Sequence, residues 1–86
     1  PWDYRYRFQV AGANIMIREY DQAIGEYQAT LRLFPTFIEA KNGMAVAYAL
    51  KGDRRTAERL LIEVLAQDPG YHSARVNLRA VRKVKL

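Results

Sequence analysis

The sequence lacks most of the residues from which enzymes build active sites. It has no cysteine, which excludes disulfides, zinc–thiolate sites and thiol nucleophiles. Its single histidine and single serine, His72 and Ser73, are adjacent. Adjacent helical residues point about 100° apart, so this pair cannot act on one substrate atom as base and nucleophile. No glycine-rich phosphate loop and no metal-ligand spacing occurs, so we expect no enzyme activity, metal or cofactor.

Long apolar runs are also missing. No stretch of about 18 apolar residues occurs, so no segment is predicted to span a membrane. The chain begins at Pro1 rather than at methionine, and we expect it to be a fragment of a longer protein that has lost any targeting segment. The compartment stays open: the cytoplasm is slightly favoured, and the cell envelope fits if the parent protein carries a membrane segment.

Acidic residues are missing from the C-terminal end, because all nine lie at or before Asp68. The net charge of +5 therefore comes from Arg75, Arg79, Arg82, Lys83 and Lys85. The first four form a candidate basic patch, since Arg75, Arg79 and Arg82 follow the helical spacing i, i+4 and i+7. A solvated outer face is the simplest interpretation, and a contact for phosphate, an anionic surface or an acidic partner is the alternative. Nucleic acid is not the expected partner, because the aromatic residues that would stack on bases lie mostly at the other end of the chain.

Proline is scarce, and its three copies are evenly spaced. Pro1, Pro35 and Pro69 are separated by 34 residues each. A packing repeat needs small or apolar residues at fixed places in every unit. The same interval relates such residues: Ala11 with Ala45, Ala13 with Ala47, Ala23 with Ala57, Leu31 with Leu65, and Phe37 with Tyr71. The chain is therefore predicted to be built from 34-residue units.

The apolar spacing inside each unit is helical. Apolar side chains recur at i, i+3, i+4, i+7, i+11 and i+14 from Tyr20 to Phe34, and at i, i+3, i+4, i+7 and i+8 from Ala57 to Leu65 in the next unit. Gly52 suits the left-handed end of one helix, and Asp53 suits the N-cap of the next. The prolines close the second helix of each unit. The predicted helices are 3–18, 21–34, 37–51, 54–67 and 71–84, with ends uncertain by about two to four residues.

One local pattern favours a different structure. Trp2, Tyr4, Tyr6 and Phe8 alternate with polar residues, as in a half-buried strand. The repeat register aligns this segment with the helix start at 36–42, and we therefore predict a helix.

The 34-residue helix–turn–helix unit with a closing proline resembles the tetratricopeptide repeat. Small residues that match the family are Ala11 and Ala45 at the helix crossing and Ala23 and Ala57 in the second helix. The resemblance implies an all-α fold of antiparallel helix–turn–helix repeats, stacked as a right-handed α-solenoid of about five helices. It implies one domain over 1–86, with repeats at 4–37 and 38–71 and a half repeat or capping helix at 72–86. Pro1 would close a further repeat upstream.

The sequence departs from the family pattern at several places. The family's tryptophan position carries Arg7 and Lys41, and its glycine between the helices is Arg18 in the first unit. Arg79 stands where a third unit would have a small residue. A terminal capping helix therefore fits residues 72–86 better than a true third repeat.

The resemblance also implies the function, a non-enzymatic scaffold that binds a partner protein or peptide in a concave groove lined by the first helix of each repeat. The groove positions carried over from the family are Arg5, Phe8, Gly12, Ile15, Met16, Glu39, Asn42, Val46, Ala49, Leu50, Ser73, Val76 and Ala80. This mostly apolar set suits a peptide with aliphatic or aromatic anchors. For Phe8, Ile15 and Met16, packing against neighbouring helices is an equal alternative.

Some family members hold a peptide's terminal carboxylate with a clamp of cationic and asparagine side chains. The corresponding residues here are Phe8, Gly12, Gly43, Ser73 and Asn77, none of which is cationic. We therefore expect no binding of acidic chaperone tails through that clamp. Two other functions stay open: self-assembly, because repeat stacks need about three units for stability, and contact with nucleic acid or an anionic surface through the basic patch.

Overall fold

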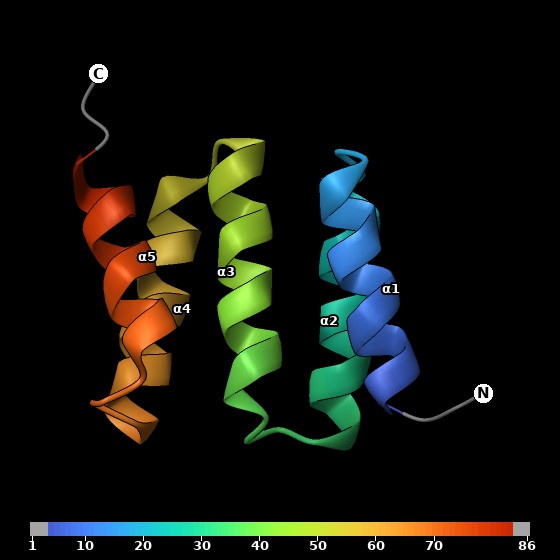
Figure 1. Cartoon of the computed structure of the whole chain (residues 1–86), viewed down its shortest axis with the longest axis horizontal. Coiled ribbons are helices and arrows are strands. Elements are labelled where there is room, and N and C mark those ends of the chain that lie inside the picture. The colour runs from blue at the N-terminus through green and yellow to red at the C-terminus, as the bar shows by residue number, and fades with distance from the viewer. Residues whose placement is uncertain (1–3, 84–86) are drawn as a thin grey trace.

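Antiparallel helices form almost the whole described part of the chain. The computed structural model describes residues 4–83, which contain five helices and no strand. These are α1 (Tyr4–Met16), α2 (Tyr20–Leu33), α3 (Ile38–Lys51), α4 (Arg54–Gln67) and α5 (His72–Lys83). Each helix packs on the next in sequence, and α3 also contacts α1 and α5. Figure 1 shows them side by side along the long axis, with α1 and α5 at opposite ends. The predicted all-α stack of helix–turn–helix units is confirmed.

The helix ends differ slightly from the predicted ones, for local reasons. α1 stops at Met16 rather than at 18, and Arg18 then adopts a φ of 66°, which suits glycine better than arginine. α2 ends at Leu33, because Phe34 precedes a proline and is extended. The alternating aromatic segment is helical from Tyr4 onward. The predicted ends at 3 and 84, and the predictions for Pro1, Trp2 and Lys85, lie outside the described residues.

The turns after α2 and α4 repeat each other at the interval read from the sequence. The Phe37 N–H donates to the Phe34 carbonyl at 3.0 Å, and the Tyr71 N–H donates to the Asp68 carbonyl at 3.0 Å. These donors and acceptors are each 34 residues apart, and in both turns a proline follows the accepting residue. The 34-residue period therefore describes backbone geometry as well as side-chain type.

Alanine fills the places where the helices come closest. Seven alanines are 0% exposed: Ala11, Ala23, Ala40, Ala45, Ala47, Ala57 and Ala74. Between them pack larger buried side chains, among which Leu61 and Val64 are completely enclosed. Ala13, the counterpart of Ala47, is exposed, because no helix packs before α1 within residues 4–83. A core made of small side chains lets the helices approach closely. Each of the few larger core residues then contributes a large share of the packing.

Each pair of consecutive helices also carries one ion pair. The four pairs are Arg7–Glu26 (3.3 Å), Lys51–Asp21 (2.6 Å), Lys41–Glu63 (3.3 Å) and Arg82–Glu58 (2.6 Å). The side chains of most of these residues are well exposed to solvent, so each pair contributes little stability by itself. The hydrogen bond to Asp21, followed by its charge, raises the pKa of the Lys51 ammonium.

The turn between α3 and α4 has the predicted chemistry. Gly52 ends α3 with a φ of 107°, and its N–H donates to the carbonyls of Tyr48 and Ala49. Asp53 caps α4: its Oδ1 accepts the Thr56 N–H at 3.2 Å, and its Oδ2 accepts the Thr56 hydroxyl at 2.7 Å. The hydroxyl bond, and then the backbone bond, lower the pKa of the Asp53 carboxyl from its usual 3.8.

This cap predicts a specific loss of stability in acid. Since the folded-state pKa lies below the unfolded one, the Asp53 carboxylate stabilises the fold above pH 3.8, and the contribution disappears as pH falls through the folded pKa. We expect Asp53→Asn, which keeps a capping oxygen but cannot ionise, to show a smaller fall in Tm below about pH 4 than the wild type. Thermal unfolding followed by circular dichroism across that range tests this, and parallel curves for the two proteins would contradict it.

Candidate peptide groove and basic surface

A small apolar hollow lies between the first helices α3 and α5. Its volume is about 110 Å³. The residues that line it are Ala45, Val46, Ala49, Leu50, Leu61, Asn77, Ala80 and Val81. The α3 residues recur one helical turn apart and so share a face, and Asn77 is the one polar side chain. Leu61, from α4, is 0% exposed and closes the hollow from beneath. We call this hollow the α3–α5 groove.

A hydrogen-bond network borders the α3–α5 groove and ties its two helices together. Asn42, which is 8% exposed, donates from Nδ2 to the Ser73 hydroxyl at 3.2 Å. Its Oδ1 accepts a hydrogen bond from Asn77 Nδ2 at 3.1 Å. Both ends of the Asn42 amide are therefore used inside the protein, as buried polar groups require. Asn42, predicted to face a ligand, instead fixes the distance between α3 and α5.

Phe8 and Ile15 of α1 belong to the packing rather than to an open surface. The Phe8 ring lies 5.9 Å from the Tyr27 ring, edge to face, and 5.2 Å from the Phe37 ring, centroid to centroid. Ile15 also packs against the buried core. Of the alternatives left open by the sequence, the structure favours packing for these two residues. Met16 is different, since it is 84% exposed.

The other predicted groove residues are spread over the surface. Arg5, Glu39 and Val76 are exposed, and Gly12 is partly exposed, but none of them lines the α3–α5 groove. Of the predicted set, the structure brings four residues into that groove: Val46, Ala49, Leu50 and Ala80. Leu61 and Val81 were not predicted to take part, because their apolar spacing is that of core residues and carries no separate signal.

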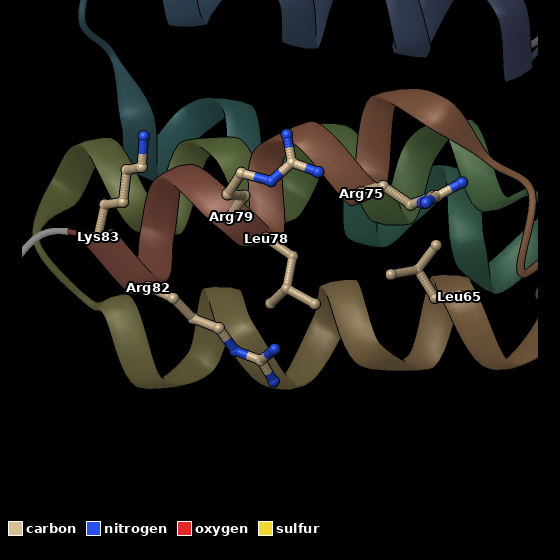
Figure 2. A pocket seen from close by; sticks show the side chains of 6 residues that line it. All are labelled: Leu65, Arg75, Leu78, Arg79, Arg82 and Lys83. Atoms are coloured by element: carbon tan, nitrogen blue, oxygen red, sulfur yellow. The ribbon is translucent and has the colours of Figure 1, made fainter.

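A larger hollow lies between α4 and α5. Its volume is about 520 Å³, and it brings together the four residues of the predicted basic patch with Leu65 and Leu78: Arg75, Arg79, Arg82 and Lys83. Figure 2 shows the two leucines pointing into the space between the helices, with the cationic side chains around them. None of the six lining residues is acidic. We call this the basic hollow.

A second hollow adjoins it and extends the positive charge. Its volume is about 400 Å³, and its lining residues are Arg54, Arg55, Glu58, Val81 and Arg82. Arg82 lines both hollows and pairs with Glu58, while the buried Nε of Arg54 has no hydrogen-bond partner among the described residues. Arg54 and Arg55 could not be predicted as lining residues, because only antiparallel packing places the start of α4 beside the end of α5.

Residues 4–83 contain neither a metal-binding cluster of side chains nor a membrane-spanning helix. No group of three or more histidine, cysteine, aspartate or glutamate side chains is arranged to hold a metal ion there. No helix in that part of the chain is long and apolar enough to cross a membrane.

Comparisons with known proteins agree with this fold. The tetratricopeptide repeat family model matches residues 18–81, well over half of the chain. The solved structure of the first TPR of Spaghetti (RPAP3) bound to HSP90 peptide SRMEEVD superposes with a TM-score of 0.88. The match covers 96% of this chain and 66% of that one at 17% identity, so it shows the fold alone. No curated protein matches the sequence. The chain therefore belongs to the tetratricopeptide repeat family, whose repeats are protein-interaction modules.

Proposed function

We propose that this chain is a non-enzymatic scaffold that binds a peptide segment of a partner protein along its first helices. The α3–α5 groove is the observation that carries the proposal. An apolar hollow beside a fixed polar group is the usual means of holding one anchoring side chain and setting its direction. The solved relative that holds a peptide shows that a domain of this fold accepts such a ligand.

The groove residues suggest how a peptide would bind. Leu50, 53% exposed, and Val46, partly exposed, offer apolar surface to an aliphatic or aromatic anchor. Asn77 donates its amide to Asn42, which holds the side chain in place and leaves its Oδ1 to accept a peptide N–H. Because the network with Asn42 is already formed, little side-chain entropy is lost when the ligand binds.

The surroundings of the clamp positions support a ligand without an acidic carboxyl terminus. Phe8 is held between aromatic rings, and Gly43 lies directly against Tyr27. Ser73 and Asn77 are engaged with Asn42, and neither carries a positive charge. Without charge-assisted bonds from lysine or arginine, a terminal carboxylate loses its strongest contacts. We expect the SRMEEVD peptide to bind with a Kd weaker than about 100 µM.

A peptide-display selection against the whole chain tests the proposed function, followed by affinities of the selected peptides for two variants. We expect Leu50→Asp to weaken binding by about tenfold or more, since an anchor site would then hold a buried carboxylate. Ile62→Asp is the matched control: Ile62 is 47% exposed, sits on α4 and does not line the groove. It should change the affinity by less than about twofold.

The outcomes separate the groove from other surfaces. Selected peptides that bind the Leu50 variant as tightly as the wild type would contradict the proposal. SRMEEVD binding that saturates at micromolar concentration would contradict the predicted ligand chemistry. Light scattering on the same samples measures the mass, so that self-association, which the sequence left open, is not mistaken for a loss of ligand binding.

A further inference from the structure

We propose that the basic hollow between α4 and α5 docks an acidic amphipathic helix of a partner protein. This surface is distinct from the α3–α5 groove and has different chemistry. Leu65 and Leu78 form an apolar floor, and the cations around it are those that give the chain its excess charge. Figure 2 shows Arg82 reaching toward α4, where it pairs with Glu58, and Arg79 and Lys83 reaching the other way, so Arg79 and Lys83 carry positive charge that has no acidic partner within residues 4–83.

Comparison with the other repeats indicates that the basic hollow is a surface on which a further helix can pack. Leu78 and Arg79 of α5 correspond, at the 34-residue interval, to Met44 and Ala45 of α3. Those two residues are 8% and 0% exposed, within the packed pair of α3 and α4. Within residues 4–83, α5 contacts α3 and α4 alone, so it lacks a counterpart of the second helix that follows and packs on α1 and on α3. A groove between two antiparallel helices is a surface on which a third helix packs readily.

The same comparison indicates that, within residues 4–83, the basic hollow lacks the acidic partner that the other repeats supply. In the first unit Arg7 of α1 pairs with Glu26 of the covering helix α2, and in the second Lys41 of α3 pairs with Glu63 of α4. The corresponding residue of α5 is Arg75, whose side chain makes no hydrogen bond or ion pair within residues 4–83, although its backbone N–H donates to the Tyr71 carbonyl at 3.2 Å. A helix that covers α5 would complete the pattern with a carboxylate.

Arg79 and Lys83 are two further cationic residues along α5 that a carboxylate could pair with. Neither has an ion pair within the described part of the chain, and with Arg75 they are spaced at i, i+4 and i+8. That spacing places a cation about every 6 Å along one line of the helix. A helix laid beside α5 that carries carboxylates one turn apart would meet all three, with its apolar residues on Leu65 and Leu78.

Arg79 indicates that the occupant differs from the chain's own covering helices. In the two complete units this position is alanine, and Ala11 and Ala45 are both 0% exposed where the second helix approaches. An arginine there prevents the same close approach and offers a guanidinium instead. The geometry therefore favours a partner helix held by charge and aliphatic contact over a copy of the repeat's second helix.

The lining residues favour a peptide over a nucleic acid. Neither the basic hollow nor the adjoining one contains an aromatic side chain, and proteins that bind single strands stack bases on aromatic rings. Leucine side chains match aliphatic residues of a helix, and apolar floors with charged rims are typical of helix-in-groove recognition.

Fluorescence anisotropy with the whole chain tests this docking site. The probe is a labelled synthetic helix of about 18 residues with leucines on one face and glutamates beside them. Three comparison ligands are a scrambled peptide of the same composition, single-stranded polyuridylate and vesicles containing anionic phospholipid. Two charge reversals are compared, Arg79→Glu and the control Arg32→Glu. Arg32 is also exposed, lies on α2 and carries the same charge change away from the hollow.

The amphipathic helix is expected to bind about tenfold more tightly than the scrambled peptide, because only the former presents its leucines on one face. Arg79→Glu should weaken it by about tenfold, and Arg32→Glu or Leu50→Asp by less than about twofold. The proposal is overturned if the scrambled peptide binds equally well, if both charge reversals act alike, or if no peptide binds. Binding confined to polyuridylate or to vesicles also overturns it.

Discussion

Replacing Leu61 with alanine should lower the free energy of unfolding by about 3 kcal/mol. Leu61 is 0% exposed and is among the largest side chains that are completely buried. Truncation removes buried methyl groups and leaves a cavity that neighbouring alanines are too small to fill. In a domain of this size such a loss should lower Tm by more than about 10 °C. Leu61 also lines the α3–α5 groove. The variant therefore also tests whether the candidate site depends on this side chain.

The next residue provides the control. Ile62 lies on the same helix and loses a similar side chain in Ile62→Ala, but it is 47% exposed. We expect this change to cost no more than about 1 kcal/mol. Urea unfolding of both variants, followed by far-ultraviolet circular dichroism, measures the difference. Similar losses for the two variants would contradict the complete burial of Leu61 in the core.

Replacing Gly43 with alanine should also destabilise the fold, by about 2 kcal/mol. A Cβ at this position would lie 2.5 Å from Tyr27 Cζ and 2.6 Å from its hydroxyl oxygen. Tyr27 is only 4% exposed, and burial raises the pKa of its hydroxyl. Its ring cannot move without disturbing the packing of α2 against α3. This contact joins the first repeat to the second, so it limits how closely α2 and α3 can pack.

Gly25→Ala is the matched control, because a Cβ there meets nothing within 4 Å. Alanine in an exposed helical position should stabilise the protein by about 0.5–1 kcal/mol. Thermal unfolding is expected to show that Gly43→Ala lowers the stability of the protein and that Gly25→Ala raises it. A Gly43→Ala variant as stable as Gly25→Ala would remove the argument for close packing at Tyr27. The double change Gly43→Ala/Tyr27→Leu should lose less than the sum of the single losses, because the smaller side chain relieves the clash.

The sequence by itself determined the repeat, the helices and the family. The 34-residue interval, the prolines and the Gly52–Asp53 turn act through local backbone preferences and side-chain period. Such features do not depend on contacts with distant residues, so the helix ends differ from the predicted ones by at most two residues at every described end. The largest difference, at the end of α1, lies where Arg18 takes the place of a glycine.

The tertiary structure decided what the candidate site residues do. Phe8 and Val46 are both apolar residues at groove positions of first helices, yet one packs between aromatic rings and the other lines the α3–α5 groove. Asn42 is a polar residue at a position predicted to contact a ligand, but its two side-chain hydrogen bonds go to α5. Periodicity tells which residues share a helical face, but it does not tell which neighbouring side chain covers that face.

For the basic patch too, the sequence predicted one part of the surface and the tertiary structure added the rest. The stripe on α5 follows from spacing along one helix, so the sequence was sufficient to predict it. Its apolar floor and the adjoining arginines, Leu65, Arg54 and Arg55, come from α4. Their place beside α5 depends on how two antiparallel helices pack and at what axial offset. That offset is set by the fit of many side chains at once, which no local pattern in the chain encodes.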